Sequence, residues 1–179
     1  KYIKKYSWSG ILFEPVNDMF LKLKDNYKNH KNKLIFENLA ISNKNGEDLI
    51  NRVPLDKIPN KYYLGMSTLS NNYKHLKEKN SDGTPLFIKE KIKISKFKPI
   101  VDKYDITKID ILQIDTEGYD LIVFNEIFSL FKPSFICIEH HHLTNNDRKI
   151  LEESLKNYYK NVLNTPHPKT GICYEFIAY

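Results

Sequence analysis

Residues 109–120 read IDILQIDTEGYD, and this stretch decides the fold. Its first part, residues 109–115, is a short and mainly apolar run, which is typical of a strand buried on both faces of a parallel sheet. After it, apolar residues recur at steps of three and four, the spacing of the buried face of an amphipathic helix. These residues are Leu121, Phe124, Ile127, Phe128 and Phe131. The stretch therefore predicts a buried strand that leads through a polar turn into a helix.

Further strands lie on both sides of this unit. Short apolar runs predict buried strands at residues 10–14, 34–41 and 134–139. Two last runs, 161–164 and 172–179, have no helix between them, so they must pair antiparallel. Strands that alternate with helices indicate an α/β fold. We therefore expect a mostly parallel, doubly wound sheet that finishes in an antiparallel C-terminal strand pair.

Helices are predicted between these strands. Helical spacing of apolar residues indicates a helix over about 16–29, between the first two strands. The sequence Thr144-Asn145-Asn146-Asp147 resembles a capping box that opens another helix. The inner face of that second helix should hold Ile150, Leu151, Leu155 and Tyr158.

Residues 47–96 depart from the regular pattern. Pro54, Pro59 and Pro85 interrupt short strand-like pieces, of which residues 88–94 are the clearest. No flexible linker or internal repeat divides the chain. We therefore expect a single domain over residues 1–179, with an irregular insertion at about 47–96 that lies near the active site.

Composition and charge exclude several classes of partner. The net charge is +6, but only two of the 28 basic residues are Arg, and the Lys residues are scattered along the chain. Bidentate recognition of phosphate and guanine favours Arg, so we expect no nucleic-acid partner. No apolar run approaches the ~20 residues that a membrane-spanning helix needs, and the first residues lack the apolar block of a signal peptide. We expect no membrane span and a cytoplasmic location.

Polar side chains gather where the predicted strands end. In open α/β sheets, ligands bind outside the carboxyl ends of the strands, where the strand order reverses. Glu14 ends one buried strand and is placed like the acidic residue that accepts hydrogen bonds from ribose hydroxyls in dinucleotide and S-adenosylmethionine sites. The other polar residues at strand ends are Ser42, Asp115 with Glu117, and Glu139 with His140, His141 and His142.

The turn Asp115-Thr116-Glu117-Gly118 gives the sharpest local signal. It joins a buried strand to an amphipathic helix, so two carboxylates lie near the unpaired amides of a helix N-terminus. One interpretation is that Asp115 and Glu117 only cap this helix. A single carboxylate would suffice for capping, however, so the second can orient a cofactor amine or take a hydroxyl proton.

The run from Glu139 to His142 has two interpretations. Carboxylate and imidazole groups are ordinary zinc or iron ligands. Consecutive residues at a strand end point to alternating sides, so at most two of them can converge on one spot. We therefore expect no metal, and we expect His140 or His141 to act as a general base, because an unperturbed histidine pKa suits proton removal near neutral pH.

Several of these segments together resemble the FkbM family of methyltransferases. The matching segments are 10–15 (GILFEP), 38–42 (NLAIS), 65–69 (GMSTL) and 111–119 (ILQIDTEGY), and Ile138-Glu139-His140 follows some twenty residues later. The resemblance covers nearly the whole chain. It implies a Rossmann-like class I methyltransferase fold, with S-adenosylmethionine as methyl donor. It also implies a small-molecule or glycan acceptor that is methylated on a hydroxyl of a sugar, glycolipid or secondary metabolite.

The resemblance and the strand-end residues together assign the site. Glu14 and Pro15 would hold the ribose of the donor, and the 38–42 turn would border its adenine. Asp115 and Glu117 would line the methionine and methyl region, with His140 or His141 as the base. The cofactor-binding set is thus Glu14, Pro15, Asn38, Ala40, Ile41, Ser42 and Asp115, and the catalytic set is Asp115, Glu117, His140 and His141.

One departure from the family concerns the beginning of the chain. A first strand with a glycine-rich cofactor loop should precede the 10–14 strand in this family, but Gly10 is the sole glycine before Glu14. We therefore expect that the first strand and glycine loop are lacking. Strands 10–14 and 109–115 would then have no strand between them, and their facing backbone groups would be unpaired. A catalytically inactive fragment or assembly module is the alternative function, and a homo-oligomer stays open.

Overall fold

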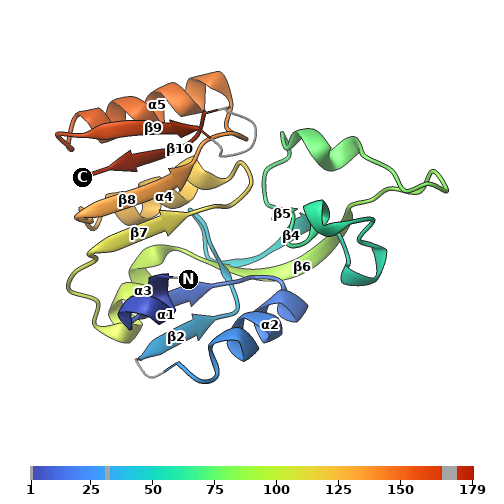
Figure 1. Cartoon of the computed structure of the whole chain (residues 1–179), viewed down its shortest axis with the longest axis horizontal. Coiled ribbons are helices and arrows are strands. Elements are labelled where there is room, and N and C mark those ends of the chain that lie inside the picture. The colour runs from blue at the N-terminus through green and yellow to red at the C-terminus, as the bar shows by residue number, and fades with distance from the viewer. Residues whose placement is uncertain (1, 31–32, 167–172) are drawn as a thin grey trace.

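The computed structural model describes residues 2–30, 33–166 and 173–179 and has a mixed α/β fold (Figure 1). The helices are α1 (Tyr2–Tyr6), α2 (Asn17–Tyr27), α3 (Phe97–Tyr104), α4 (Asp120–Phe128) and α5 (Asn145–Lys156). The strands are β1 (Gly10–Phe13), β2 (Leu34–Glu37), β3 (Ala40–Ile41), β4 (Gly46–Arg52), β5 (Ser67–Thr68), β6 (Ile88–Ser95), β7 (Ile111–Ile114), β8 (Phe135–Glu139), β9 (Val162–Pro166) and β10 (Cys173–Ala178). No helix among the described residues has the length and apolar character needed to cross a bilayer.

The strands form three sheets. β1 and β2 pair parallel, β7-β8-β10-β9 form a second sheet, and β3-β6-β4-β5 form a third. Of the described strand pairings, three are parallel and four antiparallel, so the expectation of a mostly parallel sheet was wrong. The antiparallel pairs beyond the expected C-terminal one are β4 with β5, β4 with β6, and β8 with β10. The expected antiparallel C-terminal pair is confirmed as β9 and β10.

The predicted strand at residues 34–41 is divided in the structure. β2 ends at Glu37, and β3 begins at Ala40 and pairs with β6 in a different sheet. The Asn38 side chain at the break donates hydrogen bonds to the carbonyl oxygens of Glu14 (2.8 Å) and Pro15 (3.1 Å). These bonds tie the end of β2 to the end of β1. Because apolar residues lie on both sides of Asn38, the sequence pattern predicts one continuous strand here.

The span 47–96 contains more regular structure than expected. β4 and β6 pair antiparallel along their lengths, with Ile50 opposite Glu90. Ile50, Ile92 and Ile94 pack together with Val16 in a small apolar cluster. The alternation of Ile and charged residues in β6 fits a strand with one buried face. The irregular part is therefore residues 53–87, which have a small core of their own around Tyr73, Leu86 and Phe87.

The main core lies around β7, β8 and β10. Ile136 and Ile138 of β8 pack with Phe124 of α4 and with Leu151 and Leu155 of α5. Burying each such side chain stabilises the fold by about 1.5–3 kcal/mol. The core thus fixes β7, β8 and the turn that joins β7 to α4.

Two residues that the sequence predicted for the inner face of α5 lie outside. Ile150 is 42% exposed and Tyr158 is 55% exposed. Tyr158 lies beyond the end of α5 at Lys156, so it no longer follows the helical period, and Tyr159 is buried in its place. The capping prediction is confirmed, because Thr144 Oγ1 accepts a hydrogen bond from the backbone N–H of Asp147 (3.1 Å).

β1 and β7 each pair along one edge only. β1 pairs with β2, and β7 pairs with β8; in the part of the chain that the structure describes, no strand pairs with their other edges. Ile111 at the start of β7 is 43% exposed, in contrast to Leu112 and Ile114. The two parallel pairs are therefore separate sheets in this chain.

Candidate functional site

The carboxyl ends of the parallel strands face one side of the molecule. In Figure 1, β1, β2, β7 and β8 point the same way, toward the segment that holds β4 and β5. Glu14 follows β1, Asp115 follows β7, and Glu139 ends β8. This is the edge at which ligands bind in open α/β sheets.

The turn between β7 and α4 is held by Asp120. This buried carboxylate accepts hydrogen bonds from the Thr116 backbone N–H (2.7 Å), the Thr116 hydroxyl (2.8 Å) and the Gly118 N–H (2.9 Å). These bonds hold the turn before α4, and in the described part of the chain no side-chain hydrogen bond caps α4 at Tyr119, so the structure does not show Asp115 or Glu117 as a helix cap. Both of those side chains are directed elsewhere.

Glu117 has an unusual backbone conformation. Its φ is 55°, in the left-handed region, and the next residue, Gly118, has a φ of 94°. The Thr68 hydroxyl of β5 donates a hydrogen bond of 2.7 Å to the Glu117 carbonyl oxygen. A Cβ atom on Gly118 would lie 3.0 Å from the backbone oxygen of His142. The turn is therefore held in a strained shape that brings Glu117 close to the segment after β8.

Glu117, Glu139 and His142 meet at this point. His142 Nε2 lies 3.1 Å from Glu117 Oε2 and 3.9 Å from Glu139 Oε1. The Asp115 carboxyl group lies close enough to that of Glu139 for the two to influence each other's protonation. Side-chain exposure is 20% for Glu117, 1% for Glu139 and 6% for His142, so these groups are largely removed from water.

Burial shifts the protonation of this cluster. It raises the pKa of both Asp115 and Glu117, because the charged carboxylate loses hydration. It raises the pKa of Asp120 to about 6 for the same reason. Burial, together with the nearby His141, Lys74 and His75, lowers the pKa of His142 to about 3. His142 is therefore a neutral imidazole at neutral pH.

Aromatic residues from the irregular segment 53–87 border the cluster. The Tyr73 ring lies 4.7 Å from the His142 ring, and His75 lies 5.9 Å from it. Burial, with the Glu117 charge as the next cause, raises the pKa of Tyr73, so its phenol keeps its proton. Tyr62 packs edge-on against His75 at 5.9 Å. Residues 53–87, which lie within the insertion predicted at about 47–96, are thus next to these carboxylates.

The two histidines predicted as bases lie in different surroundings. His140 is buried, its ring packs at a tilt against Phe176 with centroids 4.2 Å apart, and its Nε2 lies 2.9 Å from Asn164 Oδ1 of β9. His141 lies with its Nε2 2.9 Å from Lys74 Nζ and its ring 4.8 Å from that of His142. Of the two, His141 lies beside the carboxylate cluster, and His140 packs into the C-terminal strands.

His142 was missed as a site residue by the sequence reasoning. The alternation rule holds within a strand, but β8 ends at Glu139, and the chain then turns, with the Leu143 N–H bonded to the His140 carbonyl oxygen at 3.2 Å. This turn returns His142 to the side of Glu139, three residues earlier. The apolar run ends at Glu139, and this end of the strand was the sequence signal that a turn, and not further alternation, follows.

Glu14, Pro15 and Asn38 form a connected group at the ends of β1 and β2. Glu14 Oε1 accepts a hydrogen bond from the Val16 backbone N–H (2.9 Å), and burial raises the pKa of this carboxyl group. Asn38 binds the carbonyl oxygens of Glu14 and Pro15 through its side-chain amide. Within the described ranges, no hydrogen bond or ion pair joins Glu14 directly to Asp115 or Glu117.

The residues after Asn38 connect to the second half of the site. Ala40 and Ile41 pair with Ile94 and Ser95 of β6. Ser42 is fully buried, and its hydroxyl lies 3.0 Å from the hydroxyl of Tyr119, the residue before α4. The 38–42 turn thus lies against the start of α4, next to the turn that carries Glu117.

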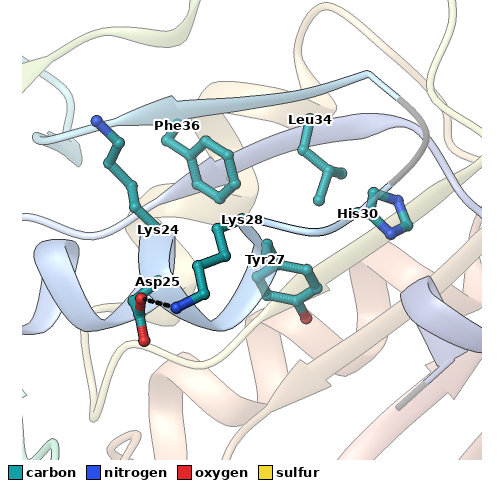
Figure 2. Close-up of a pocket in the computed structure, with 7 residues that line it drawn as sticks. All are labelled: Lys24, Asp25, Tyr27, Lys28, His30, Leu34 and Phe36. Carbon is teal, nitrogen blue, oxygen red and sulfur yellow. Dashed lines mark hydrogen bonds and ion pairs between the residues drawn. The ribbon is translucent and has the colours of Figure 1, made fainter.

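A surface hollow of about 470 Å³ lies elsewhere (Figure 2). It is lined by Lys24, Asp25, Tyr27, Lys28, His30, Leu34 and Phe36. These residues belong to the end of α2, the connection after it, and β2. Residue 34 begins β2, so the hollow extends toward the amino end of that strand, and none of the predicted site residues lines it.

Comparison with known proteins gives one match. The family model described as the Methyltransferase FkbM domain matches residues 1–163. The matched span includes every predicted site residue, from Glu14 to His141. No curated protein and no solved structure gives a significant match. The chain therefore belongs to the FkbM methyltransferase family.

Proposed function

We propose that this chain is an S-adenosylmethionine-dependent O-methyltransferase that acts on a hydroxyl of a sugar, a glycolipid or a secondary metabolite. The observation that carries the proposal is the strained 115–118 turn, which presents two carboxylates at the carboxyl end of β7 beside Glu139. This donor set fits the methyl donor, because its amine and sulfonium are positively charged and its ribose offers hydroxyl donors. When bound, S-adenosylmethionine supplies the electrophilic methyl group.

The residues divide into two groups of roles. Glu14 would accept hydrogen bonds from the ribose, and the 38–42 turn would border the adenine. Asp115 would hold the amine, and Glu117 would orient the acceptor hydroxyl. His141 is the candidate base, since it lies beside His142, whose Nε2 is 3.1 Å from Glu117. Most of the rate would come from holding the hydroxyl in line with the methyl group.

The proposal includes a Rossmann-like layout. In it, β1-β2 and β7-β8-β10-β9 would be the two parts of one sheet, with the donor across their carboxyl ends. The alternative is a catalytically inactive module that keeps the outer parts of the fold; among the described residues, no strand pairs with the outer edges of β1 and β7. Donor binding separates the two.

Isothermal titration with S-adenosylmethionine tests the function. We expect saturable binding to the wild-type protein and clear weakening in Glu14→Gln and Asp115→Asn. Glu153→Gln is the matched control, because the Glu153 side chain is 63% exposed on α5 and its ion pair is with Lys149 of the same helix. Absence of heat at millimolar donor, with the protein folded by circular dichroism, would favour the inactive module.

A further inference from the structure

We propose that Glu117, Glu139 and His142 form a binding site for one divalent transition-metal ion. Each residue offers one ligand atom, and these three atoms all lie within 4.8 Å of one another. They come from three places in the chain: the turn after β7, the last residue of β8 and the turn that follows it. The fold, and not one local motif, brings them together.

The distances suit coordination. Ligand atoms at about 2.1 Å from one ion are about 3.0 Å apart in octahedral geometry and about 3.4 Å apart in tetrahedral geometry. His142 Nε2 is 3.1 Å from Glu117 Oε2 and 3.9 Å from Glu139 Oε1. The ligand atoms of Glu117 and Glu139 lie within 4.8 Å of each other, so these two carboxylates would have to approach by up to about 1.4 Å for tetrahedral and about 1.8 Å for octahedral coordination.

The ligand types indicate which ions fit. One imidazole nitrogen with two carboxylate oxygens is a donor set for zinc, manganese or iron, whereas magnesium and calcium prefer oxygen ligands alone. Three protein ligands also leave positions for an oxygen from outside, as in catalytic metal sites. The site is therefore of the open kind.

Burial and preorganisation support the same conclusion. The Glu139 side chain is 1% exposed and that of His142 is 6% exposed, and Asp115 adds a further carboxyl group beside Glu139. Carboxylates gathered away from water are unfavourable unless positive charge balances them. The left-handed conformation of Glu117 is strain of the kind that concentrates at functional sites, and Thr68 holds it there.

A role in methyl transfer rests on the proposed function. An ion at this place would bind the acceptor oxygen and favour loss of its proton, which His141 could accept. The new oxygen–carbon bond would then form as the bond between methyl carbon and sulfur breaks. Metal binding itself does not depend on this role.

Electron paramagnetic resonance with Mn²⁺, after chelator treatment of the wild-type protein, tests the site. We expect one bound ion per chain. Glu139→Gln, which keeps the shape of the side chain, and His142→Ala should each weaken binding by about 10-fold or more, as expected when a site loses a key group. Glu78→Gln is the matched control, because Glu78 contacts His75 at 2.5 Å outside the cluster, and it should bind like wild type.

Three outcomes would overturn the proposal: no bound Mn²⁺ at millimolar concentration, equal binding by wild type and both ligand variants, or equal weakening by the control. Thermal melts identify variants that fail to fold, and Glu117→Gln then replaces such a variant. Donor titration is run separately without metal. Donor binding without Mn²⁺ binding would overturn the metal site alone, and Mn²⁺ binding without donor binding would overturn the proposed function alone.

Discussion

Gly118→Ala should destabilise the protein more than alanine at two other glycines. The φ of Gly118 is 94°, where an L-residue costs about 1–2 kcal/mol. The new Cβ would also lie 3.0 Å from the backbone oxygen of His142, and backbone cannot move aside as a flexible side chain can. Overpacking of this kind costs about 1–3 kcal/mol. The free energy of unfolding should therefore fall by about 2–5 kcal/mol.

Two glycines serve as matched controls. Gly83 has a φ of 82° but nothing within 4 Å of an added Cβ, so Gly83→Ala has the backbone strain without the clash. Gly10 has nothing within 4 Å and lies outside the left-handed region, so Gly10→Ala should leave stability unchanged or raise it by up to about 1 kcal/mol. Urea denaturation gives the three values. If Gly118→Ala matches Gly10→Ala, the described approach of the two turns is wrong.

Three other predictions concern side chains. Asp120→Asn should lower the free energy of unfolding by about 1–3 kcal/mol, because an amide NH₂ cannot accept the hydrogen bond from the Gly118 N–H. The pKa of Asp120 in the folded protein is raised to about 6 from 3.8, so the contribution of this side chain to stability falls as pH rises between these values. Thermal melts over pH 3–7 should therefore show this pH dependence in the wild type and not in the variant. His141→Ala should lower kcat by about 100-fold or more with little change in melting temperature, whereas His140→Ala, which leaves Asn164 without its partner, should mainly lower the melting temperature; the reverse pattern would exchange their roles. Arg52→Met should lower the free energy of unfolding in urea by about 1.5–3 kcal/mol, because the buried guanidinium binds Asp18 in bidentate geometry (2.9 and 2.6 Å) and lies 3.1 Å from Glu90. An unchanged midpoint would contradict this.

The sequence was sufficient where one local rule determined the structure. The apolar run before Asp115 and the helical stripe after it predicted β7 and α4, and both are present. Thr144 caps α5 as its capping box indicated. The last two strands pair antiparallel because no connection long enough for a parallel crossover separates them.

The sequence was insufficient where a distant partner determined the structure. β2 and β3 separate because Asn38 binds carbonyl oxygens more than twenty residues away, which no local pattern encodes. The turn after β8 directs His142 toward Glu117, whose own position depends on Thr68 of another sheet. The position of Asp115, Glu117 and Glu139 at strand ends was therefore predictable, but the grouping of Glu117, Glu139 and His142 required tertiary structure.

Hydrogen exchange with and without S-adenosylmethionine tests whether the carboxyl ends of β1, β2 and β7 hold the methyl donor. We expect slower exchange in the segments 10–16, 37–43 and 112–120 when the donor is present. Slower exchange confined to residues 24–30 and 33–36, around the hollow in Figure 2, would contradict it.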